Sequence, residues 1–412
     1  MAAAPAPSET RPYDVVVFGA TGFTGRLACE YLARRREQPA LRWAIAGRNE
    51  SKLHEVRRML EAIDPACAHV GTIEARVDDP ASLERMAKLT RVVLTTVGPY
   101  AEHGEPVVVA CIRGGADYVD ITGEPEFVDA MIARHHEEAE KAHVRIVSCC
   151  GFDSIPHDLG ARFTVQQLPQ TQPITVEGFV RARGGMSGGT WASAIGAMSR
   201  LMQLRKPKPA RSPSADGRRV RSVKPSIRWD RRLEAWVAPL PTIDPQVVLR
   251  SARALPEYGP EFQYGHYAQV RSGVTLAASV VGIGALVVLA QVPPARKLLL
   301  KARPQGEGPS LEQRAKGWFE VTFIGRSGTT EVRTMVSGGD PGYGETAKMV
   351  SESALCLALD RDALPKRYGV LTTAVAMGDA LQKRLQRAGI RFDVIDGAPR
   401  SRRGASMHPP ST

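Results

Sequence analysis

Residues 13–27 constrain the fold more than any other part of the chain. An apolar, β-branched run, 13–18, ends in a glycine-rich turn, and helical spacing follows from Leu27 onward. A strand, a glycine-rich turn and a helix in this order form the turn that binds a dinucleotide in α/β proteins. The glycines have the spacing G-x-x-G-x-x-G, which differs from the G-x-G-x-x-G fingerprint. A glycine-rich turn without a ligand therefore stays open as the alternative.

Each glycine of this turn has an expected function. Gly19 permits the tight exit from the strand, Gly22 lets backbone N–H groups approach a pyrophosphate, and Gly25 lets the helix pack close to the sheet. The pyrophosphate is expected at the helix N-terminus, where unpaired N–H groups and the helix dipole favour negative charge. We predict cofactor contacts from the whole turn, which comprises Gly19, Ala20, Thr21, Gly22, Phe23, Thr24 and Gly25.

Arg48 indicates which dinucleotide is preferred. It follows a predicted strand, 41–46, at the position where NAD-preferring proteins usually have an acidic residue for the ribose 2′-hydroxyl. An arginine there accommodates a 2′-phosphate, and Lys52, one turn later, adds a point charge. The pattern favours NADPH over NADH, with a solvated Arg48 as the alternative. Further cofactor contacts are predicted at the ends of the third and fourth strands, from Asp78, Thr96 and Gly98.

Strands alternate with helices through the first part of the chain. The expected strands are 13–18, 41–46, 75–77, 91–97, 117–120 and 144–149. The expected helices are 51–62, 82–88, 105–113 and 125–142. Such alternation over about 145 residues predicts a doubly wound parallel sheet. We therefore assign residues 12–155 to a Rossmann-type dinucleotide-binding domain of the α/β class.

The second part of the chain is less regular. Strand-like runs at 173–182, 318–325 and 331–336 accompany helical runs at 191–203, 346–359 and 378–389. Strands that cluster away from βα repeats predict a second, α+β substrate domain over residues 156–360. A C-terminal helical segment is expected at 361–396, with a disordered leader at 1–11 and a disordered tail at 397–412.

Positive charge is concentrated in one loop. The chain has a formal net charge of +12, and residues 205–232 contain eleven Lys or Arg against two Asp, which gives +9. The basic loop 205–232 is either a solvated charge run or a surface for an acidic partner, such as anionic lipid or an acidic carrier protein. Nucleic acid is not an expected partner, because no recognised binding motif accompanies the charge.

Residues 274–292 form an uncharged apolar stretch. As a helix they span roughly 28 Å, close to the thickness of a bilayer. A buried core helix is one interpretation. The other is attachment to a membrane surface or lipid droplet, helped by the flanking cations Arg271, Arg296, Lys297, Lys301 and Arg303. We predict peripheral association, because a true span would place the two halves of one domain on opposite sides of a bilayer.

The six cysteines bear on location and on metal binding. They form no C-x-x-C pair and show no metal-ligand spacing with histidines. This pattern is typical of reduced thiols in a cytoplasmic protein, and it predicts no metal site.

Several stretches together resemble a known family. Residues 13–27, 46–48, 92–100, 120–124, 151–156 and 369–381 look like those of the saccharopine dehydrogenase-like oxidoreductases. Within that family the closest resemblance is to the mycobacterial trans-acting enoyl reductases. The resemblance implies a Rossmann domain with an α/β substrate domain and NADPH-dependent reduction of a carbon–carbon double bond. It implies as partner an acyl chain on a polyketide synthase or carrier protein, and as product a phthiocerol-type lipid.

Three polar residues near the expected nicotinamide are candidate catalytic residues. Enoyl reduction needs a hydride donor, a polarised thioester carbonyl and a proton source for the α-carbon. Tyr100 is the first candidate for the proton donor or the carbonyl partner, with a packed turn residue as the alternative. Asp153 and Ser154 either shape the pocket or cap the next helix. The small-residue loop 187–190 is expected to face the substrate.

Two other functions stay open. One is a dehydrogenase of the same fold that acts on an amino-acid-like substrate such as saccharopine, whose carboxylates would need several cationic side chains. The obvious cationic cluster lies in the basic loop 205–232, which counts against this function. The other is a cofactor-binding protein on a lipid surface without turnover. The glycine-rich turn supports cofactor binding in every case and does not separate them.

Overall fold

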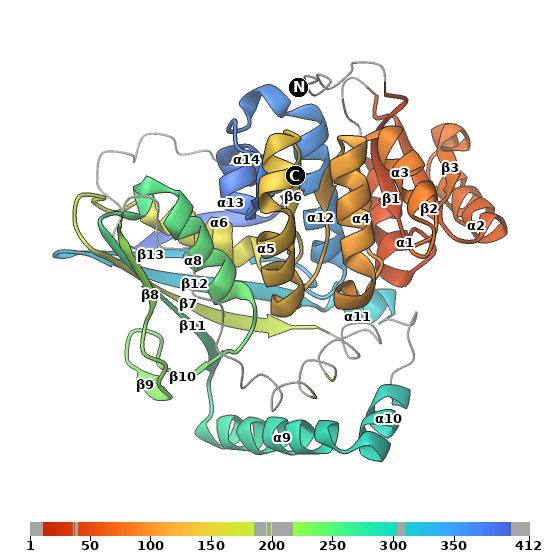
Figure 1. Cartoon of the computed structure of the whole chain (residues 1–412). Helices are drawn as coiled ribbons and strands as arrows, with labels where there is room; N and C mark the ends of the chain where they lie inside the picture. The colour runs from red at the N-terminus through yellow and green to blue at the C-terminus, as the bar shows by residue number, and fades with distance from the viewer. Residues whose placement is uncertain are drawn as a thin grey trace, which may run out of the picture.

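The computed structural model describes residues 11–35, 37, 40–184, 195, 199, 217–302 and 310–396. Two β-sheets lie next to each other, and helices cover both faces of the first (Figure 1). Several predicted features fall wholly or mostly outside the described residues: the leader before Arg11, the loop 187–190, the helix 191–203, the first half of the basic loop and the tail 397–412.

The first sheet is parallel throughout and has the strand order β14-β6-β5-β4-β1-β2-β3. Its strands are β1 (Tyr13–Phe18), β2 (Trp43–Gly47), β3 (Gly71–Glu74), β4 (Thr90–Thr95), β5 (Asp117–Val119), β6 (Arg145–Val147) and β14 (Gly369–Leu371). The order reverses between β1 and β4, which pair directly. Ligands of open α/β sheets bind at such a reversal, beyond the carboxyl ends of the strands. The predicted doubly wound fold is confirmed.

Six helices cover this sheet. They are α1 (Phe23–Arg34), α2 (Glu50–Glu61), α3 (Pro80–Lys88), α4 (Tyr100–Gly114), α5 (Pro125–Lys141) and α12 (Gly344–Leu359). β1 shows how the two faces differ: Val15 and Val17 pack with apolar residues of α1, α2 and α12, whereas Val16 and Phe18 pack with those of α3, α4 and α5. Because both faces are covered, residues 15–18 of β1 are an unbroken apolar run, as parallel strands usually are.

The second sheet is mixed, with the order β15-β13-β12-β7-β11-β10-β9 and β8 paired to β11. Its strands are β7 (Ile174–Arg183), β8 (Arg219–Ser222), β9 (Arg228–Asp230), β10 (Ala235–Pro239), β11 (Glu261–Val270), β12 (Trp318–Ser327), β13 (Thr330–Gly338) and β15 (Arg391–Asp396). The accompanying helices are α6 (Ile155–Val165), α8 (Asp244–Ala254), α9 (Gly273–Gln291), α10 (Pro293–Lys301), α11 (Leu311–Ala315), α13 (Thr373–Ala376) and α14 (Gly378–Arg387). The strand-like runs predicted at 318–325 and 331–336 are present as β12 and β13, which pair antiparallel as a hairpin.

Several predicted boundaries are wrong. The third strand is β3, just before the predicted 75–77, because Ala44–Gly47 of β2 pairs with Gly71–Glu74. The segment 361–396 is not simply helical: it contributes β14 to the first sheet and β15 to the second. Part of the basic loop forms β8 and β9, where an ion pair of 2.6 Å joins Arg221 Nη2 to Glu261 Oε1.

The two predicted domains share one interior. A single apolar cluster joins Val15 and Leu94 of the first sheet to Phe323 and Val336 of the second. Helix α12, assigned from sequence to the second domain, packs on β1 and β4. Ion pairs attach the C-terminal segment to the same interior: the buried guanidinium of Arg384 pairs with Glu37, Glu352 and Asp360. The chain therefore crosses between the sheets several times.

Helix α9 is the apolar stretch predicted at 274–292, and it is not part of the core. Only Leu276 and Ala290 are buried, whereas the side chains of Val274 and Val281 are 81% and 72% exposed. The helix runs along the outside of the molecule below the second sheet (Figure 1). Its length and its mean hydropathy of 2.3 would allow it to cross a membrane. The interpretation as a buried core helix is therefore wrong.

Candidate functional site: the dinucleotide turn and an acidic histidine cluster

The turn after β1 can be built only with glycine at two positions. Gly19 has φ +91°, and a Cβ on Gly25 would lie 2.1 Å from the carbonyl oxygen of Gly19. Thr96, which follows β4, donates its hydroxyl to the same carbonyl over 3.3 Å. The first turn of α1 therefore lies directly against the reversal between β1 and β4, as predicted for Gly19 and Gly25, whereas the cofactor contact of Thr96 stays a prediction.

The other residues of the turn surround the N-terminus of α1. Gly22 is the N-cap, and the N–H groups of the first helical turn have no acceptors within a helix. Phe23 packs edge-on against Tyr343, with ring centroids 5.0 Å apart, so the start of α12 supports the start of α1. Ala20 is buried, while Thr21 and Thr24 are half-buried. These donors and the helix dipole suit a pyrophosphate.

Arg48 and Lys52 lie beyond the end of β2, next to the turn. Both side chains are exposed, and Asn49 caps α2 by accepting a hydrogen bond of 2.9 Å from the N–H of Lys52. Asp78 pairs with Arg76, which lowers the pKa of the Asp78 carboxyl, and the charge of Arg48 adds to this effect. An exposed guanidinium at this sheet edge is available to a 2′-phosphate.

Tyr100 is a structural residue in this geometry. Its buried hydroxyl donates to the carbonyl of Thr95 over 3.1 Å and accepts from the N–H of Ile121 over 3.4 Å. Burial raises its pKa. The hydroxyl thus ties the loop after β4 to the loop after β5, which matches the alternative of a packed turn residue. Gly98, beside it, is exposed.

Asp153 and Ser154 connect β6 to α6 and differ in their surroundings. Solvent reaches Asp153, while the surrounding protein and the negative charge of Asp244 raise its pKa. A Cβ on Gly123 would lie 3.5 Å from Asp153 Oδ2, so this carboxylate faces the loop after β5. Ser154 is the buried N-cap of α6, but its hydroxyl makes no capping bond and has no hydrogen-bond partner among the described residues. Of the two alternatives for Ser154, the side-chain cap is therefore wrong.

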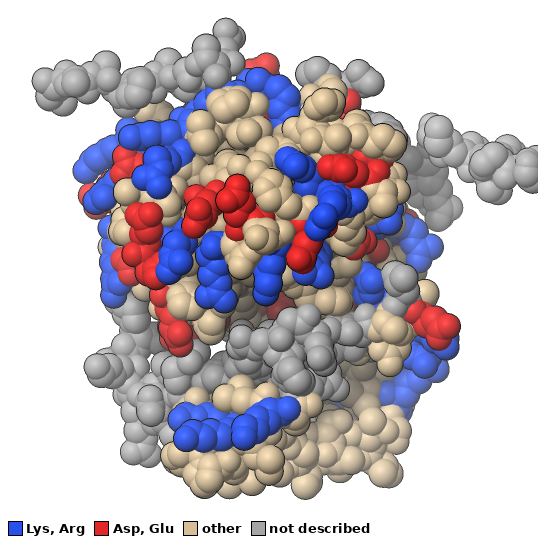
Figure 2. Space-filling model, turned by 90° about the vertical axis from the view of Figure 1, so that its right-hand side faces the viewer, with Lys and Arg blue, Asp and Glu red and all other residues tan. Residues whose placement is uncertain are grey.

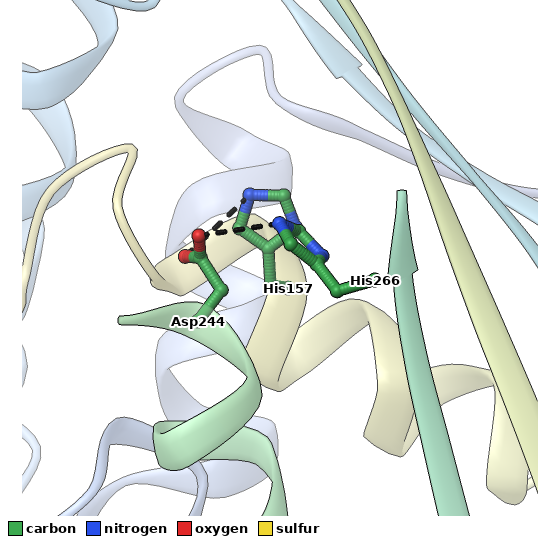
Figure 3. Close-up of side chains that lie close together, drawn as sticks. All are labelled: His157, Asp244 and His266. Atoms are coloured by element: carbon green, nitrogen blue, oxygen red, sulfur yellow. Dashed lines mark ion pairs between the residues drawn. The ribbon is translucent and has the colours of Figure 1, made fainter. Parts of the chain in front are cut away.

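Beside these residues, three buried side chains converge from separate elements (Figure 3). His157 comes from the first turn of α6, Asp244 from the start of α8 and His266 from β11. His157 Nε2 lies 3.7 Å from Asp244 Oδ1, and His266 Nε2 lies 3.4 Å from Asp244 Oδ2. The imidazole rings meet edge-on with centroids 4.8 Å apart.

The electrostatics of this cluster follow from its burial. Burial lowers the pKa of His157 to about 4, so its imidazole is neutral at pH 7. Burial opposes ionisation of Asp244, but the two histidines and a hydrogen bond from the Thr242 hydroxyl lower its pKa. Sequence reasoning missed this cluster. His157 directly follows residues 151–156, which resemble the family, but no regular spacing along the chain connects it to Asp244 or His266.

The turn, the strand order and the second sheet define a two-sheet α/β protein that binds NAD(P). Residues 15–147 match the family model of the saccharopine dehydrogenase NADP binding domain. The chain is 35% identical to the human saccharopine dehydrogenase-like oxidoreductase, over 95% of this chain and 99% of that one. It is 37% identical to a Mycobacterium tuberculosis protein named provisionally as a trans-acting enoyl reductase, over 92% and 97% of the two chains.

The fold is also found in a solved structure. Apo saccharopine dehydrogenase (L-Glu forming) from Saccharomyces cerevisiae aligns with a TM-score of 0.51 at 12% identity, over 93% of this chain and 100% of that chain. The chain belongs to the saccharopine dehydrogenase-like oxidoreductase family. It is an NAD(P)-binding oxidoreductase of that family.

Substituting Gly25→Ala tests the turn. Because the added Cβ would meet the Gly19 carbonyl, we expect a cost of about 1–3 kcal/mol in stability and a loss of cofactor affinity of at least roughly tenfold. Fluorescence titration with NADPH and thermal unfolding measure the two effects. Gly282→Ala is the control, since nothing lies within 4 Å of its new Cβ. Unchanged NADPH affinity in Gly25→Ala would contradict this account of the turn.

Proposed function

We propose that this protein is an NADPH-dependent reductase that reduces the carbon–carbon double bond of an acyl thioester on a carrier protein or polyketide synthase. The name of the mycobacterial relative supports this activity. We further propose that the reduced product is used to make phthiocerol-type lipids, as the family resemblance of the sequence implies.

The acidic character of the candidate site is the observation that carries the proposal. Asp244, whose pKa is lowered, places negative charge beside the carboxyl edge of the first sheet, and this charge raises the pKa of Asp153. Nearby arginines of the second sheet are already paired: Arg228 and Arg232 bind Glu177 over 2.6 and 3.2 Å. Saccharopine and similar amino acids carry several carboxylates that such a site would repel. A neutral enoyl thioester meets no such repulsion.

Cofactor binding and proton donation belong to different residues in the proposed reaction. NADPH, when bound, supplies a hydride to the β-carbon of the enoyl group. The turn from Gly19 to Gly25 holds the pyrophosphate, and Arg48 holds the 2′-phosphate. Asp153 holds the proton for the α-carbon, because solvent reaches its carboxyl group and its raised pKa keeps a protonated fraction near neutral pH. The product is the saturated thioester, with NADP⁺ released.

We also propose that α9 attaches the protein to a lipid surface, in keeping with the cytoplasmic location expected from the cysteines. Helix α9 is mostly exposed and is apolar on all sides, so that burying it in lipid is favourable. It differs in this from most interfacial helices, which have one polar face. Lys and Arg gather beside the apolar surface in Figure 2, and α10 carries Arg296, Lys297 and Lys301. Anionic lipid attracts such cations. An apolar acyl substrate would be met at the same surface.

Substituting Arg48→Ala tests the preference for NADPH. Loss of a charge-assisted contact worth about 1.5–3 kcal/mol predicts a Kd for NADPH that is roughly 10- to 150-fold higher, with little change for NADH. Arg58→Ala, at an exposed position of the following helix α2, is the control. Equal losses for NADPH and NADH would place the 2′-phosphate away from Arg48.

A parallel assay separates the candidate reactions. We expect NADPH oxidation with an enoyl thioester of pantetheine or of a carrier protein, and none with saccharopine-pathway substrates. Asp153→Asn should lower kcat by about 10²–10⁴ while NADPH affinity is kept. Turnover of amino-acid substrates alone would refute the enoyl reductase. Bound NADPH without any turnover would favour a cofactor-binding protein on a lipid surface.

Charged substitutions on α9 test the lipid attachment. Val281→Asp combined with Val288→Asp should abolish co-sedimentation with vesicles of anionic phospholipid, since each Asp costs about 2.5–3.5 kcal/mol in a bilayer. Leu89→Asp, at an exposed apolar position outside α9, is the control. NADPH binding reports that each variant is folded. Unchanged sedimentation of the double variant would rule out α9 as the attachment.

A further inference from the structure

We propose that His157, Asp244 and His266 form a binding site for a divalent transition-metal ion, with Zn²⁺ as the best match. The sequence predicts no metal site, and the enoyl reductase proposal does not require one. The three residues offer two imidazole nitrogens and a carboxylate oxygen that all lie within 4.8 Å of one another. All three side chains are buried, and Figure 3 shows them pointing toward a common centre.

The distances suit a shared ion better than direct hydrogen bonds. The separations of 3.7 and 3.4 Å between the histidine nitrogens and the Asp244 oxygens exceed those of good N–H···O bonds. Ligand atoms about 2.0–2.2 Å from a tetrahedral zinc ion lie roughly 3.3–3.5 Å from each other. The separations of both histidine nitrogens from Asp244 are therefore close to those of ligands on one ion, and all three ligand atoms lie within 4.8 Å of one another.

Unsatisfied polar atoms point to the same conclusion. Asp244 Oδ1 and His266 Nε2 are buried and have no hydrogen-bond partner among the described residues. Burying a carboxylate that lacks a partner for one of its oxygens is costly. A divalent cation at the common centre would satisfy both atoms and offset the charge of Asp244.

The surroundings orient two of the three ligands. Tyr264 Oη lies 3.3 Å from His266 Nδ1, so a proton on Nδ1 leaves the lone pair of Nε2 directed at Asp244. The hydroxyl of Thr242 donates to Asp244 Oδ2, which leaves Oδ1 free to coordinate. Outer hydrogen bonds of this kind accompany metal-binding histidines in proteins.

The ligand set indicates the class of ion. Two imidazoles with one carboxylate suit Zn²⁺ and related first-row ions, whereas Ca²⁺ and Mg²⁺ take mainly oxygen ligands. Three protein ligands leave a fourth position open for water or for a carbonyl oxygen. An ion here would lie close to Asp153, at the edge of the candidate reaction site.

Metal content and titration test this proposal with untagged, full-length protein. After removal of bound metal with a chelator, we expect one Zn²⁺ per chain to bind with submicromolar Kd, measured by calorimetry against a competing chelator. Co²⁺ at the same stoichiometry should give the visible absorption of a four-coordinate ion. Asp244→Asn and His157→Gln should each raise the Kd for Zn²⁺ by at least roughly tenfold.

The control is His135→Gln, because His135 of α5 also lies near carboxylates, 2.9 Å from Glu105 and 3.5 Å from Glu138, but it is not part of the proposed cluster. This variant should bind Zn²⁺ like the native protein. NADPH binding verifies folding of each variant independently of metal. Failure of the folded native protein to bind stoichiometric Zn²⁺ overturns the proposal, as does unchanged binding in both ligand variants. A bound ion would offset the charge of Asp244, which raises the pKa of Asp153, so the enoyl thioester assay on metal-free and metal-loaded protein tests the reductase proposal separately.

Discussion

The contact between Gly25 and the carbonyl of Gly19 is the constraint on which the site depends. It holds the first turn of α1 against the ends of β1 and β4, where Thr96 bonds to the same carbonyl. Any side chain at Gly25 would push the helix away from the sheet. Phe23, in the first turn of α1, packs on Tyr343 at the start of α12. Helix α12 in turn fixes the loop after β6, because the N–H of Phe152 donates to the hydroxyl of Thr346.

The shared core explains how the site is assembled from distant segments. The C-terminal part of the chain returns to complete the first sheet with β14 and to cover it with α12, so that the two sheets cannot separate as independent domains. Asp153, His157, Asp244 and His266 consequently meet between elements of both sheets. The rigidity of this arrangement suits a reaction in which positioning of hydride donor and acceptor accounts for much of the rate.

Local patterns made much of the first sheet predictable. The run Val15–Val16–Val17 and the glycines after it carry their own signals, and so does Arg48 at the end of β2. Short strands such as β14 carry almost no signal, because three residues cannot show a period and their pairing is set by tertiary contacts. The burial of Tyr100 and the exposure of α9 likewise depend on neighbours far along the chain. The cluster around Asp244 could not be found from sequence, since its members share no spacing.

A crystal structure of the NADPH complex tests the central claim most directly. We expect the pyrophosphate on the N-terminal N–H groups of α1, the 2′-phosphate within hydrogen-bond distance of Arg48, and the nicotinamide beside the loop that carries Asp153. A cofactor bound away from the turn 19–25, or a nicotinamide directed away from Asp153, would contradict it.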